Sequence, residues 1–422
     1  MVPKGWSESY LGEVVTYKKG YAFNSSLYAE EGIRIVRISD TTRDSIHSDN
    51  PVFIAGGNVE GLEQYSLFEN DIILSTVGSR PHLLDSMVGK AVKVPRSAHN
   101  SLLNQNLVKL IPKKTKITNE YLFSMLKKKE FIQFISNLVR GNANQVSITL
   151  ADLFKYKFIL PSLPEQKKIA QILSTWDKAI SVTEKLLTNS QQQKKALMQQ
   201  LLTGKKRLLD ENGTRFSETW KLYALSKLFQ RVTTKNNGKS NNVVTISGQH
   251  GLIKQEDFFK KTVASDTLDG YFLLKKGQFA YNKSYSNGYP MGAIKRLNRY
   301  PEGVVTTLYI CFELTTPKKS CGDYWEHYFE SGLLNNSLSQ IAHEGGRAHG
   351  LLNVKPSDFF SLKVAVPGFE EQQKIASVLS AADNEISTLE KKLACLKDEK
   401  KALMQQLLTG KRRVKVDEAV AV

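Results

Sequence analysis

Two stretches of the chain carry apolar side chains at helical spacing over an unusual length. In residues 164–208, and again in residues 369–414, apolar positions follow one another in alternating steps of three and four residues. Such a repeat of about 3.5 residues is typical of helices that pack against each other along their length. Gly204 and Gly410 stand where a glycine commonly ends a helix. The pattern predicts two long helices, each of about 39 residues and roughly 58 Å.

The two helical stretches are copies of each other. Residues 194–205 and residues 400–411 both read KKALMQQLLTGK, and the same offset of 206 residues aligns LPEQKKIA with FEEQQKIA. Lys400 fills the one polar position in the apolar seam of the second copy, and Lys194 stands in the matching place of the first. Because a run of twelve identical residues does not arise by chance, the chain contains a duplicated unit. We therefore expect two helices that pack on each other, with a pseudo-twofold relation between the repeats.

Two segments of another character, residues 1–160 and 212–366, accompany the helices. Short β-branched or aromatic runs alternate in them with clusters of Gly, Asn, Ser and Asp, which is typical of mixed α/β domains. The runs expected to form strands are Ile33–Ile38, Asp71–Thr76, Leu107–Ile111, Val243–Ile246 and Val304–Leu314. Each segment begins with a Trp and has a Leu five residues later, at Trp6 and Leu11 and at Trp220 and Leu225. Otherwise the two segments differ, so repeated helices support diverged globular bodies.

The composition fits a globular protein, with 41% hydrophobic and 24% charged residues. Lys and Arg outnumber Asp and Glu by 59 to 41, and the resulting charge of +18 favours a polyanionic partner without saying which one. No apolar run predicts a signal peptide or a membrane span. The three cysteines form no CxxC pair, so we expect neither a disulfide framework nor a metal site. These features suit a cytoplasmic protein.

The chain resembles the specificity subunit of type I restriction-modification systems over essentially its full length. The most specific parts of the resemblance are LPEQKKIA and FEEQQKIA and the two copies of KKALMQQLLTGK. The resemblance implies that each globular body is a target recognition domain, which reads one half of a split site in double-stranded DNA. It also implies that the two helices form an antiparallel coiled coil, which spaces the domains and docks two methyltransferase subunits. In the restriction form, restriction subunits that translocate DNA join the complex.

This resemblance implies an α+β fold with five parts. They are target recognition domain 1 in residues 1–160, a spacer and docking helix in 161–208, target recognition domain 2 in 212–366, a second such helix in 367–414 and a tail in 415–422. The helix positions expected to face partner subunits are Glu165, Gln166, Lys168, Gln199, Gln200, Glu371, Gln372, Lys374, Gln405 and Gln406. S-adenosylmethionine, ATP and magnesium would sit on the partners, so no cofactor is expected on this chain.

Three short motifs resemble catalytic ones, and none has the required residues. Gly238-Lys239-Ser240 looks like the end of a phosphate-binding loop, but Thr233 stands where that loop needs a glycine. Residues 50–53, Asn-Pro-Val-Phe, resemble the tetrapeptide of adenine methyltransferases except at the third position. The nuclease-like spacing of Glu165 and Lys167 is not kept in the second copy. We therefore predict a subunit that does no chemistry. The alternatives are a self-contained DNA methyltransferase or nuclease, and a coiled-coil scaffold that binds DNA without sequence preference.

Four polar loops are candidates for DNA contact, because groove reading needs polar side chains on protruding elements. In the first body, the candidates follow the strand expected at 71–74 and fill a later loop: Ser75, Thr76, Ser79, Arg80, His82, Arg140, Asn142, Asn144 and Gln145. In the second body, they follow the strand expected at 278–281 and fill a later loop: Asn282, Lys283, Tyr285, Asn287, Arg347 and His349. The loops occur in the same order in both bodies. Within this set, we expect the DNA face to include Arg80, Arg140, Lys283 and Arg347.

Overall fold

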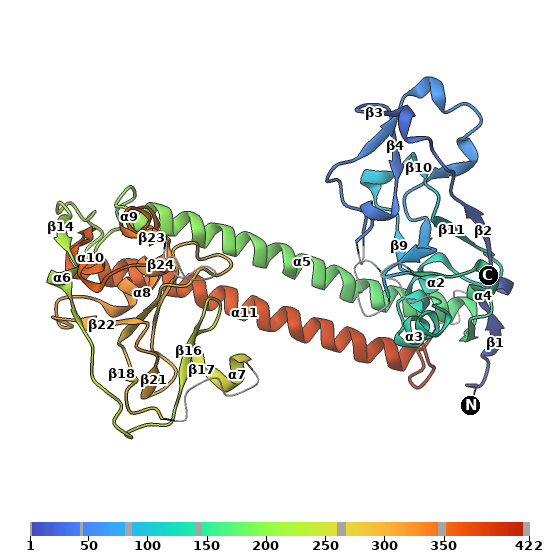
Figure 1. Ribbon diagram of the computed structural model, residues 1–422. Coiled ribbons are helices and arrows are strands. Elements are labelled where there is room, and N and C mark those ends of the chain that lie inside the picture. The colour runs from blue at the N-terminus through green and yellow to red at the C-terminus, as the bar shows by residue number, and fades with distance from the viewer. Residues whose placement is uncertain are drawn as a thin grey trace. The chain divides into compact units, whose positions relative to one another are not determined.

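The chain folds into two compact units. The computed structural model describes residues 2–42, 45–80, 87–139, 146–259, 267–344 and 352–416. Unit 1 comprises residues 1–183 and 392–422, and unit 2 comprises residues 184–391. Each unit therefore contains one globular body, the first part of one long helix and the last part of the other (Figure 1).

The two predicted long helices are confirmed. Helix α5 spans Leu163–Leu201 and helix α11 spans Phe369–Leu407, with 39 residues in each. Both end at a glycine in the left-handed region, with φ of +71° at Gly204 and +68° at Gly410. The amide two residues after each glycine donates to a carbonyl of the last helical turn, at 3.0 and 3.1 Å. Glycine is needed there because a Cβ makes this backbone conformation costly.

The long helices run antiparallel within each unit. In unit 1, Glu165 at the start of α5 pairs with Arg413, which follows the end of α11. Further along α5, Asp177 pairs with Lys400. The equivalent pairs in unit 2 are Glu371 with Arg207 and Asp383 with Lys194. All four pairs obey the 206-residue offset, so the duplication seen in the sequence is also a duplication of contacts.

Unit 1 is built on two sheets. In spatial order, the antiparallel four-stranded sheet contains β2 (Val15–Lys19), β11 (Leu107–Pro112), β7 (Ile72–Ser75) and β9 (Ala91–Lys93). The five-stranded sheet contains β3 (Tyr28–Ala29), β5 (Val52–Ile54), β4 (Ile33–Val36), β10 (Ser101–Leu103) and β6 (Ser66–Leu67), of which β4 and β10 are parallel. Two short pairs are β1 (Ser7–Tyr10) with β13 (Lys157–Leu160) and β8 (Val77–Gly78) with β12 (Val146–Ser147). The short helices are α1 (Leu11–Val14), α2 (Asn119–Leu126), α3 (Lys129–Leu138) and α4 (Leu150–Leu153).

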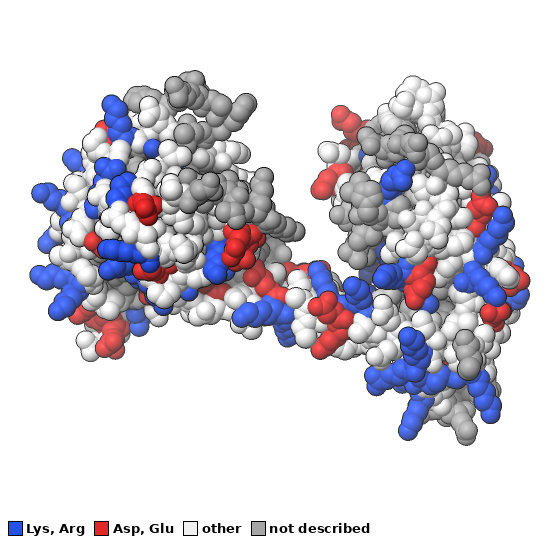
Figure 2. Space-filling view, turned by 60° about the horizontal axis from the view of Figure 1, so that its bottom comes forward, with Lys and Arg blue, Asp and Glu red and all other residues white. Residues whose placement is uncertain are grey.

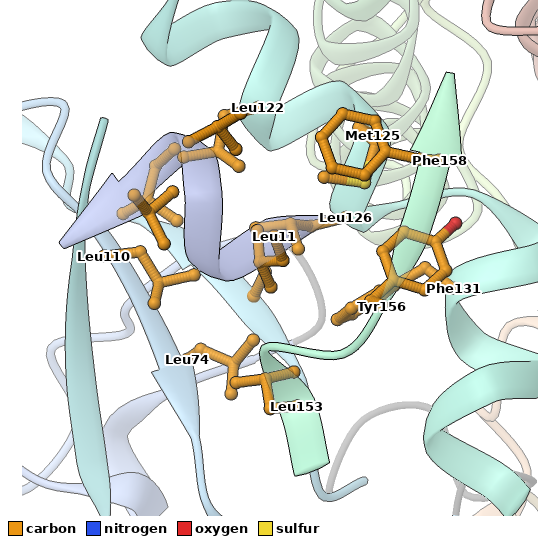
Figure 3. Close-up of a cluster of buried hydrophobic side chains, with 14 of the residues drawn as sticks. Leu11, Leu74, Leu110, Leu122, Met125, Leu126, Phe131, Leu153, Tyr156 and Phe158 are labelled. Carbon is orange, nitrogen blue, oxygen red and sulfur yellow. The ribbon is translucent and has the colours of Figure 1, made fainter. Parts of the chain in front are cut away.

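One hydrophobic core joins the globular body of unit 1 to both long helices. Figure 3 shows Leu11, Leu74 and Leu122 turned toward one another from α1, β7 and α2. The same cluster contains Leu173 of α5 and Leu407 of α11. Because burial of one such side chain contributes about 1.5–3 kcal/mol, the helices are held to the body mainly by the hydrophobic effect.

The described part of unit 2 has one four-stranded sheet and four two-stranded pairs. Its antiparallel four-stranded sheet contains, in order, β15 (Phe229–Arg231), β22 (Ile310–Leu314), β19 (Phe279–Asn282) and β20 (Ala293–Arg296). The two-stranded pairs are β14 (Lys221–Ala224) with β25 (Lys363–Val366), β16 (Val244–Ser247) with β17 (Gly251–Lys254), β18 (Phe272–Lys275) with β21 (Glu302–Val305), and β23 (His343–Glu344) with β24 (Leu352–Asn353). The helices are α6 (Leu225–Leu228), α7 (Gln255–Phe259), α8 (Gly322–Glu330), α9 (Asn335–Ile341) and α10 (Pro356–Ser361).

The core of unit 2 is richer in aromatic side chains than that of unit 1. Phe229 packs edge-on against Phe312 and Trp325, with ring centroids 5.2 and 5.0 Å apart. Leu201 of α5 and Leu379 of α11 lie in the same cluster. The two bodies thus pack against the long helices in the same way but with different side chains.

The four-stranded sheets of the two units share one topology. The order β2-β11-β7-β9 in unit 1 corresponds to β15-β22-β19-β20 in unit 2. The strand pair next to the helices also recurs, as β1 with β13 and as β14 with β25. The mixed α/β bodies and the internal repeat are therefore confirmed, although the body sequences hardly resemble each other.

One predicted strand is wrong in its extent. Residues 304–314 form two strands, β21 and β22, which pair with different neighbours. Tyr309 N donates to Thr306 O at 3.2 Å and closes a turn between them, and Leu308 is exposed in that turn. Apart from Glu313 the run consists of β-branched, aromatic and other residues common in strands, so its pattern alone did not reveal the turn. Across the described ranges, none of the helices has both the length and the apolar character needed to cross a membrane.

Candidate nucleic-acid interface

The first pair of candidate loops occupies equivalent places in the two units. Residues 75–82 begin in β7, and residues 282–288 begin in β19, its counterpart in the sheet of unit 2. The prediction that these loops correspond is thus supported by topology. A contact with DNA is not tested by this placement and stays a prediction.

Not every residue of the first loop is at the surface. Ser75 is only 1% exposed, and its hydroxyl donates to Met87 O at 3.0 Å and accepts from Lys90 N at 3.1 Å. Thr76 Oγ1 donates to Asn106 O at 3.1 Å, which also ties it to the body. Ser79 is half-buried and Arg80 is exposed. Arg80 is therefore the described residue of this loop best placed to meet a ligand.

The loop after β19 begins with anchored residues and ends with exposed ones. Asn282 Oδ1 accepts from Ser284 N at 3.1 Å and shapes the turn. Lys283 is half-buried, and burial together with the nearby Arg231 lowers the pKa of its ammonium group. Tyr285 is 64% exposed, and Asn287 is exposed as well. The two cations Lys283 and Arg231 repel each other, which favours an anion close by.

Seven candidates lie outside the described residues. They are His82, Arg140, Asn142, Asn144, Gln145, Arg347 and His349. Their roles stay predictions from the sequence.

Sequence reasoning missed a polar cleft in unit 2. The cleft has a volume of about 440 Å³ and lies between the turn that joins β16 to β17, helix α7 and the loop after β19. Gln249 and His250 of the turn line it, together with Asn287. Its sequence signal is the polar run Gly248-Gln-His-Gly251 between two apolar strands, which is typical of an ordinary hairpin turn.

Four of the predicted docking residues have partners inside the chain. In unit 1, Glu165 is buried and accepts hydrogen bonds from Trp6 Nε1 at 3.0 Å and from Arg413 Nε at 2.9 Å. Arg413 lies over the Trp6 ring, with Cζ 5.6 Å from the centroid. We call these three residues, and their equivalents in unit 2, the Trp–Glu–Arg joint. It links the end of one long helix, the start of the other and the start of the globular body.

The joint of unit 2 has the same chemistry. Glu371 accepts from Trp220 Nε1 at 3.1 Å, and from Arg207 through Nε at 2.6 Å and the second guanidinium nitrogen at 2.7 Å. Two parallel bonds of this kind make a bidentate, charge-assisted pair. The two tryptophans noted in the sequence thus mark the joints.

The glutamine after each joint carboxylate fixes another element. Gln166 Nε2 donates to Pro161 O at 2.9 Å, and its Oε1 accepts from Thr118 N, the N-cap of α2, at 2.9 Å. Gln372 makes the equivalent bonds to Pro367 O at 3.0 Å and from Cys321 N, the N-cap of α8, at 2.9 Å. Both glutamines are buried. The remaining predicted docking residues are exposed on the long helices: Lys168, Gln199, Gln200, Lys374, Gln405 and Gln406.

The segment that resembles the end of a phosphate-binding loop forms an ordinary turn. Asn236 Oδ1 accepts from Ser240 N at 2.9 Å, which closes residues 236–240 into a turn. Within the described ranges, no group of three or more His, Cys, Asp or Glu side chains is arranged to hold a metal ion. On the face drawn in Figure 2, Lys and Arg are spread over both units with Asp and Glu among them.

Comparisons with known proteins agree with this structure. Residues 3–189 match the family model of the type I restriction modification DNA specificity domain. The chain is 25% identical over 424 residues to the putative type I restriction enzyme MjaX specificity subunit of Methanocaldococcus jannaschii, covering 98% of this chain and 95% of that protein. It is 27% identical over 186 residues, 44% of this chain and 30% of the relative, to the EcoAI specificity subunit of Escherichia coli.

A solved structure has the same fold along the whole chain. The S subunit of a type I restriction-modification system from M. genitalium superposes with a TM-score of 0.57 and 15% identity, covering 96% of both chains. The fold and the joints define a protein in which two mixed α/β bodies are carried on a duplicated helical support. Residues 3–189 match the DNA specificity domain of type I restriction-modification systems, and the chain is similar over 98% of its length to a putative specificity subunit of such a system.

Proposed function

We propose that this chain is the sequence-specific DNA-binding subunit of a type I restriction-modification complex. Residues 1–160 and 212–366 act as target recognition domains, and each reads one half of a bipartite site in double-stranded DNA. The observation that carries the proposal is the contrast between the Trp–Glu–Arg joints, which repeat with the same three residue types, and the globular bodies, which diverge. If the long helices stay the same while a globular body changes, the same partner subunits can act at a new DNA target.

The subunit does no chemistry in this proposal. Two methyltransferase subunits and the restriction subunits supply catalysis, and S-adenosylmethionine, ATP and magnesium bind to them. Adenine is the base expected to be methylated, and the methyltransferase takes it out of the helix. The complex works in the cytoplasm.

The methyltransferase subunits dock on the exposed polar residues of the long helices in this proposal. These residues are Lys168, Gln199, Gln200, Lys374, Gln405 and Gln406. The buried carboxylates and glutamines of the joints support docking only indirectly, because their hydrogen bonds are used within the chain. Replacing the four exposed glutamines by glutamate should weaken co-purification with the methyltransferase subunits. Unchanged co-purification would remove these residues from the proposal.

DNA contact falls to the candidate loops, with Arg80, Arg140, Lys283 and Arg347 at the DNA face. Each Lys or Arg that meets a phosphate should lower the slope of log affinity against log salt by about 1 when it is replaced by Gln. If all four replacements leave cognate affinity unchanged, these residues are not at the DNA face.

The first experiment is a base-resolution map of adenine methylation in host DNA, with and without this gene and its methyltransferase partner. A split motif that disappears with the gene is the expected result. Binding of S-adenosylmethionine by the isolated chain would favour the alternative of a self-contained enzyme. Equal affinity for random and cognate duplexes at raised salt would favour a non-specific scaffold.

A further inference from the structure

The polar cleft of unit 2 has two walls that are fastened to each other. One wall is the turn of residues 247–251, and the other is the turn of residues 286–289. Tyr289 joins them, since its Oη lies 2.7 Å from Gly248 O. Gly248 must be glycine for this approach, because a Cβ there would stand 2.6 Å from the Tyr289 ring. The geometry of the cleft is therefore set before any ligand arrives.

Two charged residues brace Tyr289 from the side of the sheet. Lys295 Nζ of β20 donates to Tyr289 Oη at 2.9 Å and pairs with Glu330 of α8 at 2.5 Å. Glu330 also contacts the Tyr289 hydroxyl. This network connects the cleft to the four-stranded sheet, which suits a site that must hold its polar groups in fixed positions.

The cleft is lined by the apolar Ile253 and Phe258 as well as by polar side chains, and the polar ones are suited to base edges. Gln249, His250 and Asn287 are exposed, and within the described part of the chain their side chains make no hydrogen bond. Side-chain amides pair with the major-groove edge of adenine, and a carboxylate such as Asp257 accepts from the amino group of cytosine. Gln249, His250 and Asn287 therefore offer free donors and acceptors in a preformed cleft.

The charge of the cleft argues against the phosphate backbone as its ligand. Among the described residues that line it there is no Lys or Arg, and Asp257 would repel a phosphate. The cations Lys283 and Arg231 lie near each other at the root of the same loop, outside the cleft lining. If Lys283 and Arg231 bind a phosphate, base contacts and phosphate contacts would come from different parts of unit 2.

We propose that this cleft reads base edges in the DNA half-site assigned to unit 2. Gln249, His250 and Asn287 are its specificity-determining residues, and Tyr289, Lys295 and Glu330 are positioning residues that hold its walls. The inference rests on the proposed function and adds to it the residues that set one half of the target.

The test uses the full chain in complex with its methyltransferase subunits. Gln249→Ala, His250→Ala and Asn287→Ala are compared with Asn212→Ala, a change at an exposed turn of the same unit away from the cleft. Methylation maps should show relaxed or abolished preference at positions of one half-site only. Cognate affinity should fall about 5- to 150-fold for each bidentate hydrogen-bonded pair with a base that the substitution removes. The control should change neither the motif nor the affinity.

A salt titration separates base reading from phosphate binding. The three cleft variants should keep the wild-type slope of log affinity against log salt, because every bond to a phosphate remains in place. A slope reduced by about 1 would place the residue on a phosphate and overturn the inference. Tyr289→Phe keeps the ring and removes the hydroxyl, so it should relax the same base positions with the salt slope unchanged.

The failures of the two proposals are distinguishable. If the wild-type motif depends on the gene but all three cleft variants leave both half-sites unchanged, the cleft is not the reading site and the proposed function stands. If the variants no longer bind the methyltransferase subunits, the cleft docks a partner and the inference is wrong. If no motif depends on the wild-type gene, the proposed function itself fails.

Discussion

The two Trp–Glu–Arg joints contain the same residues but differ in burial. In unit 2, Glu371 and Arg207 are 2% and 19% exposed, whereas in unit 1 Glu165 and Arg413 are 9% and 42% exposed. The Glu371 pair is bidentate, while both bonds from Arg413 end on one carboxylate oxygen. Because the four residues are equivalent in sequence, the globular bodies must cause the difference. The repeated motif thus gives the same kind of ion pair in both units, and the surroundings of each joint set how strong that ion pair is.

This comparison explains how one support carries two unlike bodies. From its body each joint takes the first tryptophan and one main-chain carbonyl, that of Lys4 in unit 1 and that of Glu218 in unit 2. Each glutamine binds an N-cap amide of its body. The rest of the body is free to change, as the five-stranded sheet of unit 1 and the cleft of unit 2 show. A specificity subunit needs this freedom, since its bodies must change when the DNA target changes.

Of the changes that test this difference between the two joints, substitution of the joint carboxylates should have the largest effect on stability. Glu371→Ala should lower the free energy of unfolding by about 3–5 kcal/mol, because it leaves Arg207 and Trp220 without their buried acceptor. Glu165→Ala should cost less, since Arg413 is 42% exposed and can turn to solvent. Urea denaturation of the full chain measures both, and Glu371→Gln is the matched control that keeps an acceptor for the indole. Equal losses of unfolding free energy for Glu371→Ala and Glu165→Ala would contradict the expected order.

For the glycines that follow the long helices, substitution should be more costly in unit 1 than in unit 2, which is the opposite of the order expected for the joint carboxylates. Alanine at a left-handed position costs about 1–2 kcal/mol. At Gly410 the new Cβ would also stand 2.4 Å from Pro3 Cγ, whereas at Gly204 its nearest neighbour is the Trp220 ring at 3.4 Å. We expect Gly410→Ala to lower Tm more than Gly204→Ala. Gly56→Ala, which has open space and no left-handed φ, is the control. A smaller effect at Gly410 would mean that Pro3 moves away freely.

The lysines of the helix seam should contribute less. Lys194 pairs with Asp383 and Lys400 pairs with Asp177, and the lysine side chains are 16% and 23% exposed. Double-mutant cycles with alanine should give coupling energies of about 0.5–1 kcal/mol that fall as salt rises. The Lys194 pair should couple more strongly because it is less exposed. A coupling energy of zero in both pairs would mean that the lysines only interact with solvent and do not stabilise the chain through these ion pairs.

The smallest expected effect is a pH dependence confined to unit 2. Burial lowers the pKa of His327, although Asp383 opposes this shift, and Nε2 lies 2.9 Å from Ser380 Oγ. Since the pKa in the folded state is below the usual 6.5, the unfolded state binds more protons. The contribution of His327 is therefore complete above that value and is lost as pH falls toward the lowered pKa.

His327→Gln tests this assignment. We expect the wild-type chain to lose more Tm than the variant between about pH 7 and pH 5.5. Lys194, Asp323 and Glu330 also act on the imidazole, so their replacement should move the midpoint of the loss. Identical pH profiles for wild type and variant would exclude His327 as the titrating group.

Some features of the candidate site were predictable from the sequence. The spacing and identity of the long helices, and the equivalence of the loops after β7 and β19, followed from patterns within short windows. Ser75 was selected as a loop residue, but it is the last residue of β7 and its hydroxyl is used inside the body. Gln249 and His250 were overlooked, because nothing in a short hairpin turn indicates that α7 and another loop face it.

The sequence by itself determined the duplication, the two 39-residue helices and the family, because periodicity and repeated motifs are local properties of the chain. Only the tertiary structure decided what the repeated residues do. Glu165 is separated from Trp6 by 159 residues and from Arg413 by 248, and its role as the acceptor of both exists only once the body and the two helices meet. Burial and hydrogen-bond partners depend on such distant neighbours, and no local pattern encodes them.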